Sequence, residues 1–230
     1  MKNRRTIWYL SGVMSYIALL FFAPLLATAL IIPIAAVLKR KIHIIIASIL
    51  VGLFFAMMSY IFIPDANYDL IRHHNESMAY LNVDTIADYN RVSESRNSHL
   101  ELIPQLLSFL ISRTGDFNLL QALVCFIGFF SLSYVMLDYK VRVKANNVHF
   151  LIIYLCALFA QSIVHYFSGL YFYMAICIFV LGLYLDYIEG KRIMSMVLYA
   201  IALMVHISLI MPLAVLIVYK ILKNKINIIL

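Results

Sequence analysis

Long apolar runs separated by short polar clusters dominate the 230-residue sequence. A helix needs about 20 mostly apolar residues to cross the roughly 30 Å hydrocarbon core of a bilayer. Runs of this kind predict about six membrane-spanning helices, with five to seven as the range that the pattern allows. They lie near residues 7–38, 42–63, 117–137, 148–164, 170–185 and 193–219. The expected fold is an all-α, polytopic integral membrane protein in which residues 1–230 form a single transmembrane domain.

The first of these runs, 7–38, is long for one crossing and short for two. It contains Pro24 and Pro33, which can kink a helix. We expect one tilted helix there, kept in the mature protein because no small-residue cleavage site precedes Lys39. Its basic start, with Lys2 among the first residues, leaves the orientation of the N-terminus open.

The last run, 193–219, is also longer than one crossing needs. It carries His206, Ser208 and Pro212 near its centre, so it is either strongly tilted or broken at that point. A single crossing and a hairpin both remain open, and only a hairpin would return Lys220 to the side on which the run begins.

The one long polar interval of the chain is residues 64–116. Within it, 82–97 predicts one or two short surface helices, with Thr85 and Asp88 as a capping pair. Residues 100–112 have apolar positions at helical spacing but are too few to span, so we expect a helix at the membrane interface.

Composition and charge support this interpretation. The chain is 64% hydrophobic and 13% charged, whereas globular proteins average about 45–50% and about 25%. The net charge of +7 would suggest nucleic acid in a soluble protein, but here the cations gather in short loops and act as topology signals. The loops 39–41, 138–144 and 186–192 fall on one side and are basic, which marks that side as cytoplasmic. The interval 64–116 is then an acidic extracytoplasmic loop, and no nucleic-acid partner is expected.

A helix over 68–80 would place Asp69, Arg72, His73 and Glu76 on one face, because they follow at i, i+3, i+4 and i+7. An arginine suits a phosphate or pyrophosphate, and a carboxylate beside it could accept a proton. The alternative is a solvated helix held by its own charge pairs. A metal site that includes His74 is disfavoured because adjacent histidines diverge on a helix, so we expect no metal.

Two positions outside this interval are further candidates. His206 is an ionisable residue inside an apolar run, where it serves either a functional contact or an interhelical hydrogen bond. Gly169 opens the run 170–185 and would allow a close approach between backbone and ligand.

Three stretches resemble the EpsG-like and Wzy-like polymerases of bacterial capsules and exopolysaccharides. The stretches are Pro64-Asp-Ala-Asn-Tyr-Asp69-Leu-Ile-Arg72-His73, then Leu102 to Gly115 with Arg113, and finally Phe167-Ser-Gly169-Leu-Tyr171 followed by Val205-His206-Ile-Ser208. The first is similar to the family's Asp-Leu-x-Arg-Tyr/His element, the second to the short helix and Gly turn before the next span. The third is similar to its Gly-x-Arg…Ala helix and later His-x-Ser, although Tyr171 stands where the family usually has Arg.

The resemblance implies polymerisation of polyprenyl-pyrophosphate-linked oligosaccharide repeat units at the outer face of the bacterial cytoplasmic membrane, without a cofactor. It implies catalytic roles for Asp69, Arg72 and His73. Substrate contacts would come from Arg113, Gly169, Tyr171 and His206. Other polysaccharide-assembly proteins of the membrane are expected partners.

Two alternatives stand beside this hypothesis. The chain could be a transporter or flippase-type component that binds a glycolipid or a small solute without chemistry. Family members also usually continue through further spans beyond a point like Leu230, so a truncated member or an inactive remnant is the other alternative.

Overall fold

The structure is a computed structural model that describes residues 11–19, 22–63, 69–83, 85, 88–89, 92, 101–159 and 169–229. Apart from turns and connections, these residues are helical, and none of them lies in a β-strand. The helices are α2 (Pro24–Val37), α3 (Lys41–Tyr60), α4 (Asp69–Met78), α6 (Leu102–Ser112), α7 (Asn118–Arg142), α8 (Asn147–Phe159), α10 (Leu170–Tyr187), α11 (Arg192–Val205) and α12 (Ile210–Ile229), with a 3₁₀ turn, η1, at Ile207–Leu209. The prediction of an all-α fold is confirmed.

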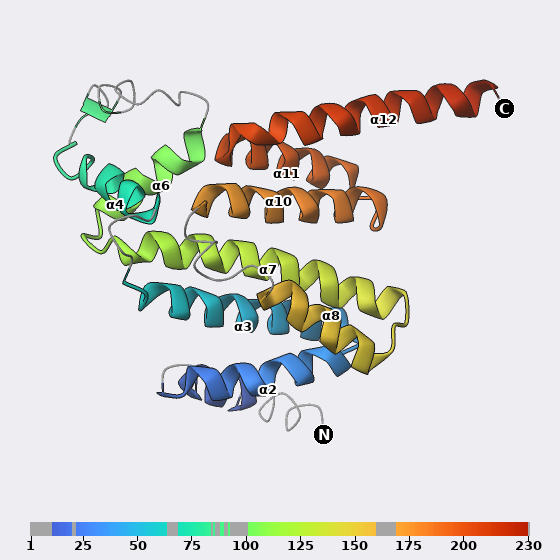
Figure 1. Cartoon of the computed structure of the whole chain (residues 1–230), viewed down its shortest axis with the longest axis horizontal. Helices are drawn as coiled ribbons and strands as arrows, with labels where there is room; N and C mark the ends of the chain where they lie inside the picture. The colour runs from blue at the N-terminus through green and yellow to red at the C-terminus, as the bar shows by residue number, and fades with distance from the viewer. Residues whose placement is uncertain are drawn as a thin grey trace.

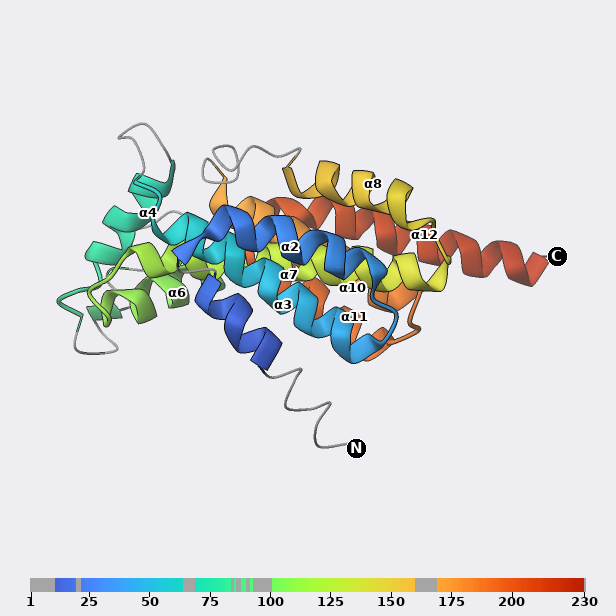
Figure 2. The ribbon, with the colours of Figure 1, turned by 90° about the horizontal axis from the view of Figure 1, so that it is seen from below.

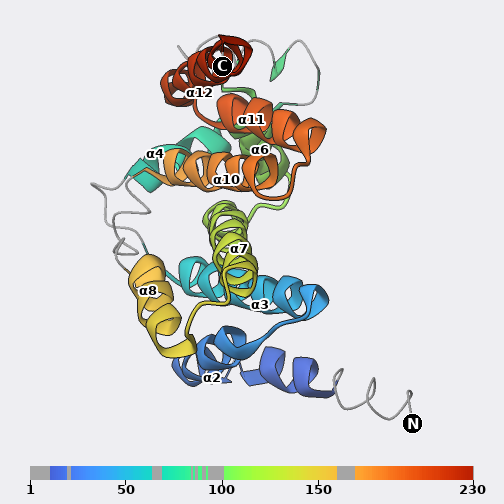
Figure 3. The same ribbon diagram turned by 90° about the vertical axis from the view of Figure 1, so that its right-hand side faces the viewer.

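The long helices lie side by side, with the neighbours α3 and α7 antiparallel and the neighbours α7 and α10 parallel, and short helices gather at one end (Figure 1). Helices α3, α7, α10, α11 and α12 follow one another across the bundle, while α2 covers α3 and α8 lies against α2 (Figure 3). We call the end that carries α4 and α6 the polar end. The opposite end, formed by the connections 38–40, 143–146 and 188–191, we call the basic end.

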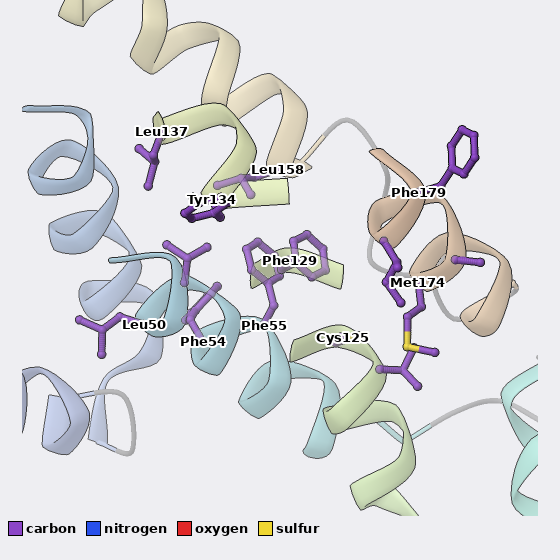
Figure 4. Packing of buried hydrophobic residues seen from close by; sticks show 14 of the residues in the cluster. Leu50, Phe54, Phe55, Cys125, Phe129, Tyr134, Leu137, Leu158, Met174 and Phe179 are labelled. Carbon is purple, nitrogen blue, oxygen red and sulfur yellow. The ribbon is translucent and has the colours of Figure 1, made fainter. Parts of the chain in front are cut away.

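The core forms where α3 meets α7 and where α7 meets α10 (Figure 4). The rings of Phe55 and Phe129 stack with centroids 3.7 Å apart and planes 6° from parallel. Gly52 lets the backbones approach, because a Cβ there would lie 3.1 Å from the carbonyl oxygen of Phe126. Close backbone approach through small residues is a common basis of helix association in membranes, where apolar burial drives packing less than in water.

Three helices, α3, α7 and α10, are long and apolar enough to cross a membrane. They coincide with the predicted runs 42–63, 117–137 and 170–185. The apolar helices α8 and α11 are shorter, with 13 and 14 residues. The chain is therefore a helical protein with membrane-length segments, while six spans remain a prediction.

The first run does not form the single tilted helix that we expected. Residues 11–19 are helical, Ala23 lies outside any helix, and α2 begins at Pro24. The two helical pieces run in different directions (Figure 2). Proline fixes φ and lacks a backbone N–H, so it is well tolerated at the first position of a helix. Pro33, in contrast, lies inside α2.

The last run is broken and turns back on itself. Helix α11 ends at Val205, His206 adopts an extended conformation (φ −153°, ψ 118°), and α12 then returns along the bundle (Figure 1). Lys220 on α12 forms an ion pair with Asp186 near the end of α10. Of the two possibilities for 193–219, the structure has the hairpin, and Lys220 lies at the basic end.

The polar interval contains two described short helices, over the predicted segments 68–80 and 100–112. Helix α6 covers most of 100–112, and α4 begins at Asp69. Thr85 and Asp88 form the expected reciprocal pair, because the Asp88 N–H donates to Thr85 Oγ1 at 3.1 Å and the Thr85 hydroxyl donates to Asp88 at 2.7 Å. Residues 64–68 lie outside the described part of the chain. Of the predicted surface segment 82–97, the structure describes residues 82, 83, 85, 88, 89 and 92.

Candidate functional site

The charged face of α4 lies at the polar end and is held together by contacts within the helix. Asp69 accepts from Arg72 Nε at 2.8 Å and pairs with His73 Nε2 at 3.2 Å. The other ring nitrogen of His73, Nδ1, lies 3.0 Å from Glu76 Oε2. The spacing i, i+3, i+4 and i+7 thus produces the one-face arrangement that the sequence predicts.

His73 differs from an ordinary surface histidine because it is buried, with 6% of its surface exposed. Burial lowers its pKa, but hydrogen bonds and charge from Asp69 and Glu76 outweigh burial and raise the pKa above its ordinary value of 6.5. A carboxylate lies at each ring nitrogen, and both carboxylates favour the protonated imidazole, which donates from both nitrogens. This stabilisation is complete below pH 6.5 and is lost as the pH rises through the raised pKa.

Asp69 stays ionised in this arrangement. Its partial burial raises the pKa, but His73 and Arg72 together lower it below the ordinary value of 3.8. Arg72 is the exposed member, with 64% of its side chain accessible. The α4 face therefore combines a buried imidazole, whose protonated form two carboxylates favour, with a guanidinium open to solvent.

The neighbouring histidine faces another part of the protein. The ring of His74 lies 6.4 Å from the ring of Phe117, next to the start of α7. Burial and the charge of His73 lower the pKa of His74, so the pKa values of the two adjacent histidines shift in opposite directions. Within the described residues, no group of three or more His, Cys, Asp or Glu side chains is arranged to hold a metal ion.

Tyr171 joins α10 to this face. Its ring meets the ring of His73 edge-on, with centroids 4.5 Å apart and planes at 79°. Tyr171 is buried, with 3% of its surface exposed. A buried aromatic ring of α10 is therefore in direct contact with the imidazole of the α4 face.

His206 and its neighbours form a second cluster beside the first turn of α10. His206 Nε2 lies 3.9 Å from Glu101 Oε1, and its ring lies 5.3 Å from that of Phe172. Nδ1 accepts from the Ser208 N–H at 3.3 Å, so the side chain also caps η1. His206 thus combines a local capping role with a contact to the start of α6.

The remaining predicted residues lie around these clusters. Gly169 precedes α10, where a Cβ would meet the Tyr173 ring at 3.4 Å. Arg113 follows α6, with its guanidinium carbon 4.7 Å from the Phe109 ring centroid. No contact in the described residues brings Arg113 to Asp69, Arg72 or His73.

Two participants were not singled out from the sequence. Glu101 is one of several acids in a polar interval, and nothing local marks it as a partner of His206. Asp116 accepts from the Tyr60 hydroxyl at 2.7 Å and from the Asn118 N–H at 3.1 Å, which ties α3 to the start of α7. Both contacts join segments distant in sequence, and only the fold reveals them.

The basic end has its own buried carboxylate, Glu189, whose side chain is 3% exposed. It accepts from Lys41 at 2.9 Å, Arg142 at 3.2 Å, Lys191 at 2.5 Å and the Tyr134 hydroxyl at 3.0 Å. Burial alone raises the Glu189 pKa, but these donors outweigh it and lower the pKa to about 2. The contacts link α3, α7 and the α10–α11 turn, which indicates a structural role.

Comparison of the chain with protein-family models, with curated proteins and with solved structures finds no match. The functional assignment therefore depends on the residues and the geometry of the polar end.

Proposed function

We propose that this chain is a membrane polymerase of the EpsG-like and Wzy-like kind. It would join polyprenyl-pyrophosphate-linked oligosaccharide repeat units into a capsular or extracellular polysaccharide at the outer face of the bacterial cytoplasmic membrane. The observation that carries the proposal is the α4 face, where buried His73 lies between Asp69 and Glu76, which favour its protonated form, beside the exposed guanidinium of Arg72. The face lies at the polar end of membrane-length helices, away from the clustered lysines.

The reaction needs two kinds of assistance. A hydroxyl of one lipid-linked unit attacks the anomeric carbon of the other chain, a new glycosidic C–O bond forms, and the bond from the anomeric carbon to the pyrophosphate oxygen breaks. The polyprenyl pyrophosphate leaves with the bonding electrons, and the hydroxyl proton passes to a base or to solvent. Fixed cations stabilise the developing negative charge, and Arg72 with His73 supplies them.

Asp69 fits the role of a positioning residue better than that of the base. Its two carboxylate oxygens bind Arg72 and His73, and its lowered pKa makes it a weak proton acceptor. In this mechanism Asp69 orients the cations, and the proton leaves through water or the released pyrophosphate.

The contact between Tyr171 and His73 leads to a prediction about the family's usual residue. Tyr171→Arg is expected to reduce polymer formation at least about tenfold, because a second cation would meet the imidazolium in a buried site. Tyr171→Phe keeps the ring and should retain most activity. The activity of both variants is measured as the chain length of the surface polysaccharide. A Tyr171→Arg variant more active than wild type would contradict the assignment of His73 as the cation.

One observation favours the alternative of a transport component. The run 193–219 is interrupted at His206, and broken helices often form substrate sites in transporters. In that case the α4 face would bind the phosphate of a lipid-linked glycan and release it on the other side without making a glycosidic bond.

The decisive experiment deletes the gene in the host strain and restores it as wild type, Asp69→Ala or Arg72→Ala at equal membrane levels. We expect wild type to restore long chains, and each variant to lose them about 100-fold while single lipid-linked repeat units accumulate on the outer face, as expected when an electrostatic contact to the transition state is removed. Asp88→Asn, a carboxylate elsewhere in the same polar interval, serves as the control and should behave as wild type.

The other outcomes separate the alternatives. Repeat units that accumulate on the inner face indicate a transport component. Polymer that is unchanged on deletion indicates a remnant, and full rescue by both variants removes the α4 face as the site.

A further inference from the structure

A pocket of about 440 Å³ opens at the basic end, away from the α4 face. Its lining consists of Lys39, Lys140, Val141, Lys144, Ala145 and Asn147. Three lysines, Lys140 at the end of α7 and Lys39 and Lys144 in two separate connections, thus surround one cavity next to the start of α8. The proposed function makes no use of this pocket.

The acids of the basic end neutralise other cations. Glu189 binds Lys41, Arg142 and Lys191, Asp138 binds Arg142, and Asp186 binds Lys220. Across the described ranges, Lys39 and Lys144 form no ion pair with a carboxylate. Lys140 is 95% buried and its ammonium lies 5.9 Å from the Phe150 ring centroid. The pocket therefore gathers three lysines, two of which have no carboxylate partner among the described residues, while the three acids of this end pair with other cations.

Lys144 occupies a backbone position that favours glycine. Its φ is +51°, in the left-handed region. Its N–H donates to Val141 O at 3.4 Å and the Ala145 N–H donates to Lys140 O at 3.2 Å, which is the Schellman arrangement that ends a helix. A lysine here strains the backbone, and what it adds over glycine is an ammonium group at the pocket.

Apolar surface leads away from the pocket on both sides. Directly after Asn147, α8 exposes Val148, Ile152 and Ile153, and α2 exposes Ile34 and Val37 just before Lys39. The acyl chains of a lipid would pack on such apolar surfaces, whereas free phosphate would make no contact with them. Basic pockets at helix ends on the cytoplasmic side are suited to acidic lipid headgroups.

We propose that the pocket of Lys39, Lys140 and Lys144 binds the phosphate headgroup of an acidic phospholipid, whose acyl chains lie along α8 and α2. The start of α8 adds the positive end of a helix dipole at Asn147. This site goes beyond the proposed function and does not depend on it.

The test uses the purified full chain in neutral detergent and measures retained lipid by native mass spectrometry. We expect phosphatidylglycerol to be retained in preference to phosphatidylcholine with the same acyl chains, and Lys39→Gln and Lys144→Gly each to weaken retention about fivefold. Lys144→Gly should at the same time keep or raise the melting temperature, because glycine suits the left-handed backbone. If Lys144 had only a structural role, lipid retention and melting temperature would not change in different directions.

The control is Arg192→Gln, which removes a cation from the same end but outside the pocket, where Arg192 forms no ion pair within the described residues. Equal retention of the two lipids would overturn the proposal, as would an Arg192→Gln loss as large as that of Lys144→Gly. Displacement of the lipid by millimolar sodium phosphate would also overturn it, because the site would then recognise the free anion. A lower melting temperature for Lys144→Gly would show that the lysine serves the fold.

Discussion

Glu189→Ala is expected to destabilise the protein by about 2–3 kcal/mol, because it removes the shared acceptor of three cations and a buried hydroxyl. The carboxylate is 3% exposed, whereas Lys41, Arg142 and Lys191 are 40–49% exposed and can be partly solvated. The expected loss of stability is therefore at or below about 3 kcal/mol, the lower end of the range for breaking a buried ion pair. Thermal unfolding of the purified protein in detergent should show a melting temperature about 5–10 °C lower.

The pH dependence gives a second measurement of the same contact. Because the Glu189 pKa falls from 4.5 to about 2 on folding, its contribution is complete above pH 4.5 and is lost as the pH falls towards 2. The difference in melting temperature between wild type and Glu189→Ala should therefore shrink on acidification. Lys191→Gln removes one exposed donor and should cost at most about 1 kcal/mol. Equal effects of the two variants would show that Glu189 is not the centre of the contacts.

Gly52→Val is expected to cost about 3 kcal/mol or more, because it forces α3 and α7 apart. A Cβ at Gly52 would lie 3.0 Å from Phe126 Cδ2 and 3.1 Å from the Phe126 carbonyl oxygen. The ring could rotate away, but the carbonyl belongs to the backbone of α7 and cannot move without the helix. Overpacking of this kind typically costs about 1–3 kcal/mol, and two added methyl groups place valine at the upper end. Thermal unfolding in detergent measures the effect.

Gly12→Ala is the matched control, since nothing lies within 4 Å of the added Cβ. Gly12 is part of the helical residues 11–19, where alanine gains up to about 1 kcal/mol of helix propensity over glycine. Gly12→Ala should thus be neutral or stabilising. A Gly52→Val protein as stable as wild type would mean that α3 and α7 are not packed as described.

Local patterns in the sequence predict what depends on neighbours along the chain. The lengths of the apolar runs predict α3, α7 and α10, because the bilayer sets the length of a spanning helix. The i, i+3, i+4 spacing predicts the contacts of Asp69 with Arg72 and His73. That spacing does not predict the burial of His73, because one of the side chains that pack on it, Tyr171, is nearly 100 residues away in the sequence.

Breaks within apolar runs are harder to predict than the runs themselves. Pro24 is compatible with a kink inside a helix and with the first position of a new one, and the structure has the second. His206 and Pro212 mark a weak point in the last run, but the return of α12 depends on contacts with α10, where Asp186 pairs with Lys220 and the ring of Tyr187 lies 6.4 Å from that of Tyr219. Glu189 resembles an ordinary turn acid for the same reason, since two of its three cations, Lys41 and Arg142, lie at the ends of helices distant in sequence.

The contact between Asp186 and Lys220 also sets an order of events during synthesis. The two residues are 34 positions apart, and at about 5–20 residues per second the ribosome needs about 2–7 s to pass from one to the other. During that interval α10 and α11 can already pair while Asp186 lacks its cation. Helix α12 is therefore secured only after α10 and α11, and a nascent chain that stalls before Lys220 would leave Asp186 with the Tyr199 hydroxyl, 3.2 Å away, in place of a cation.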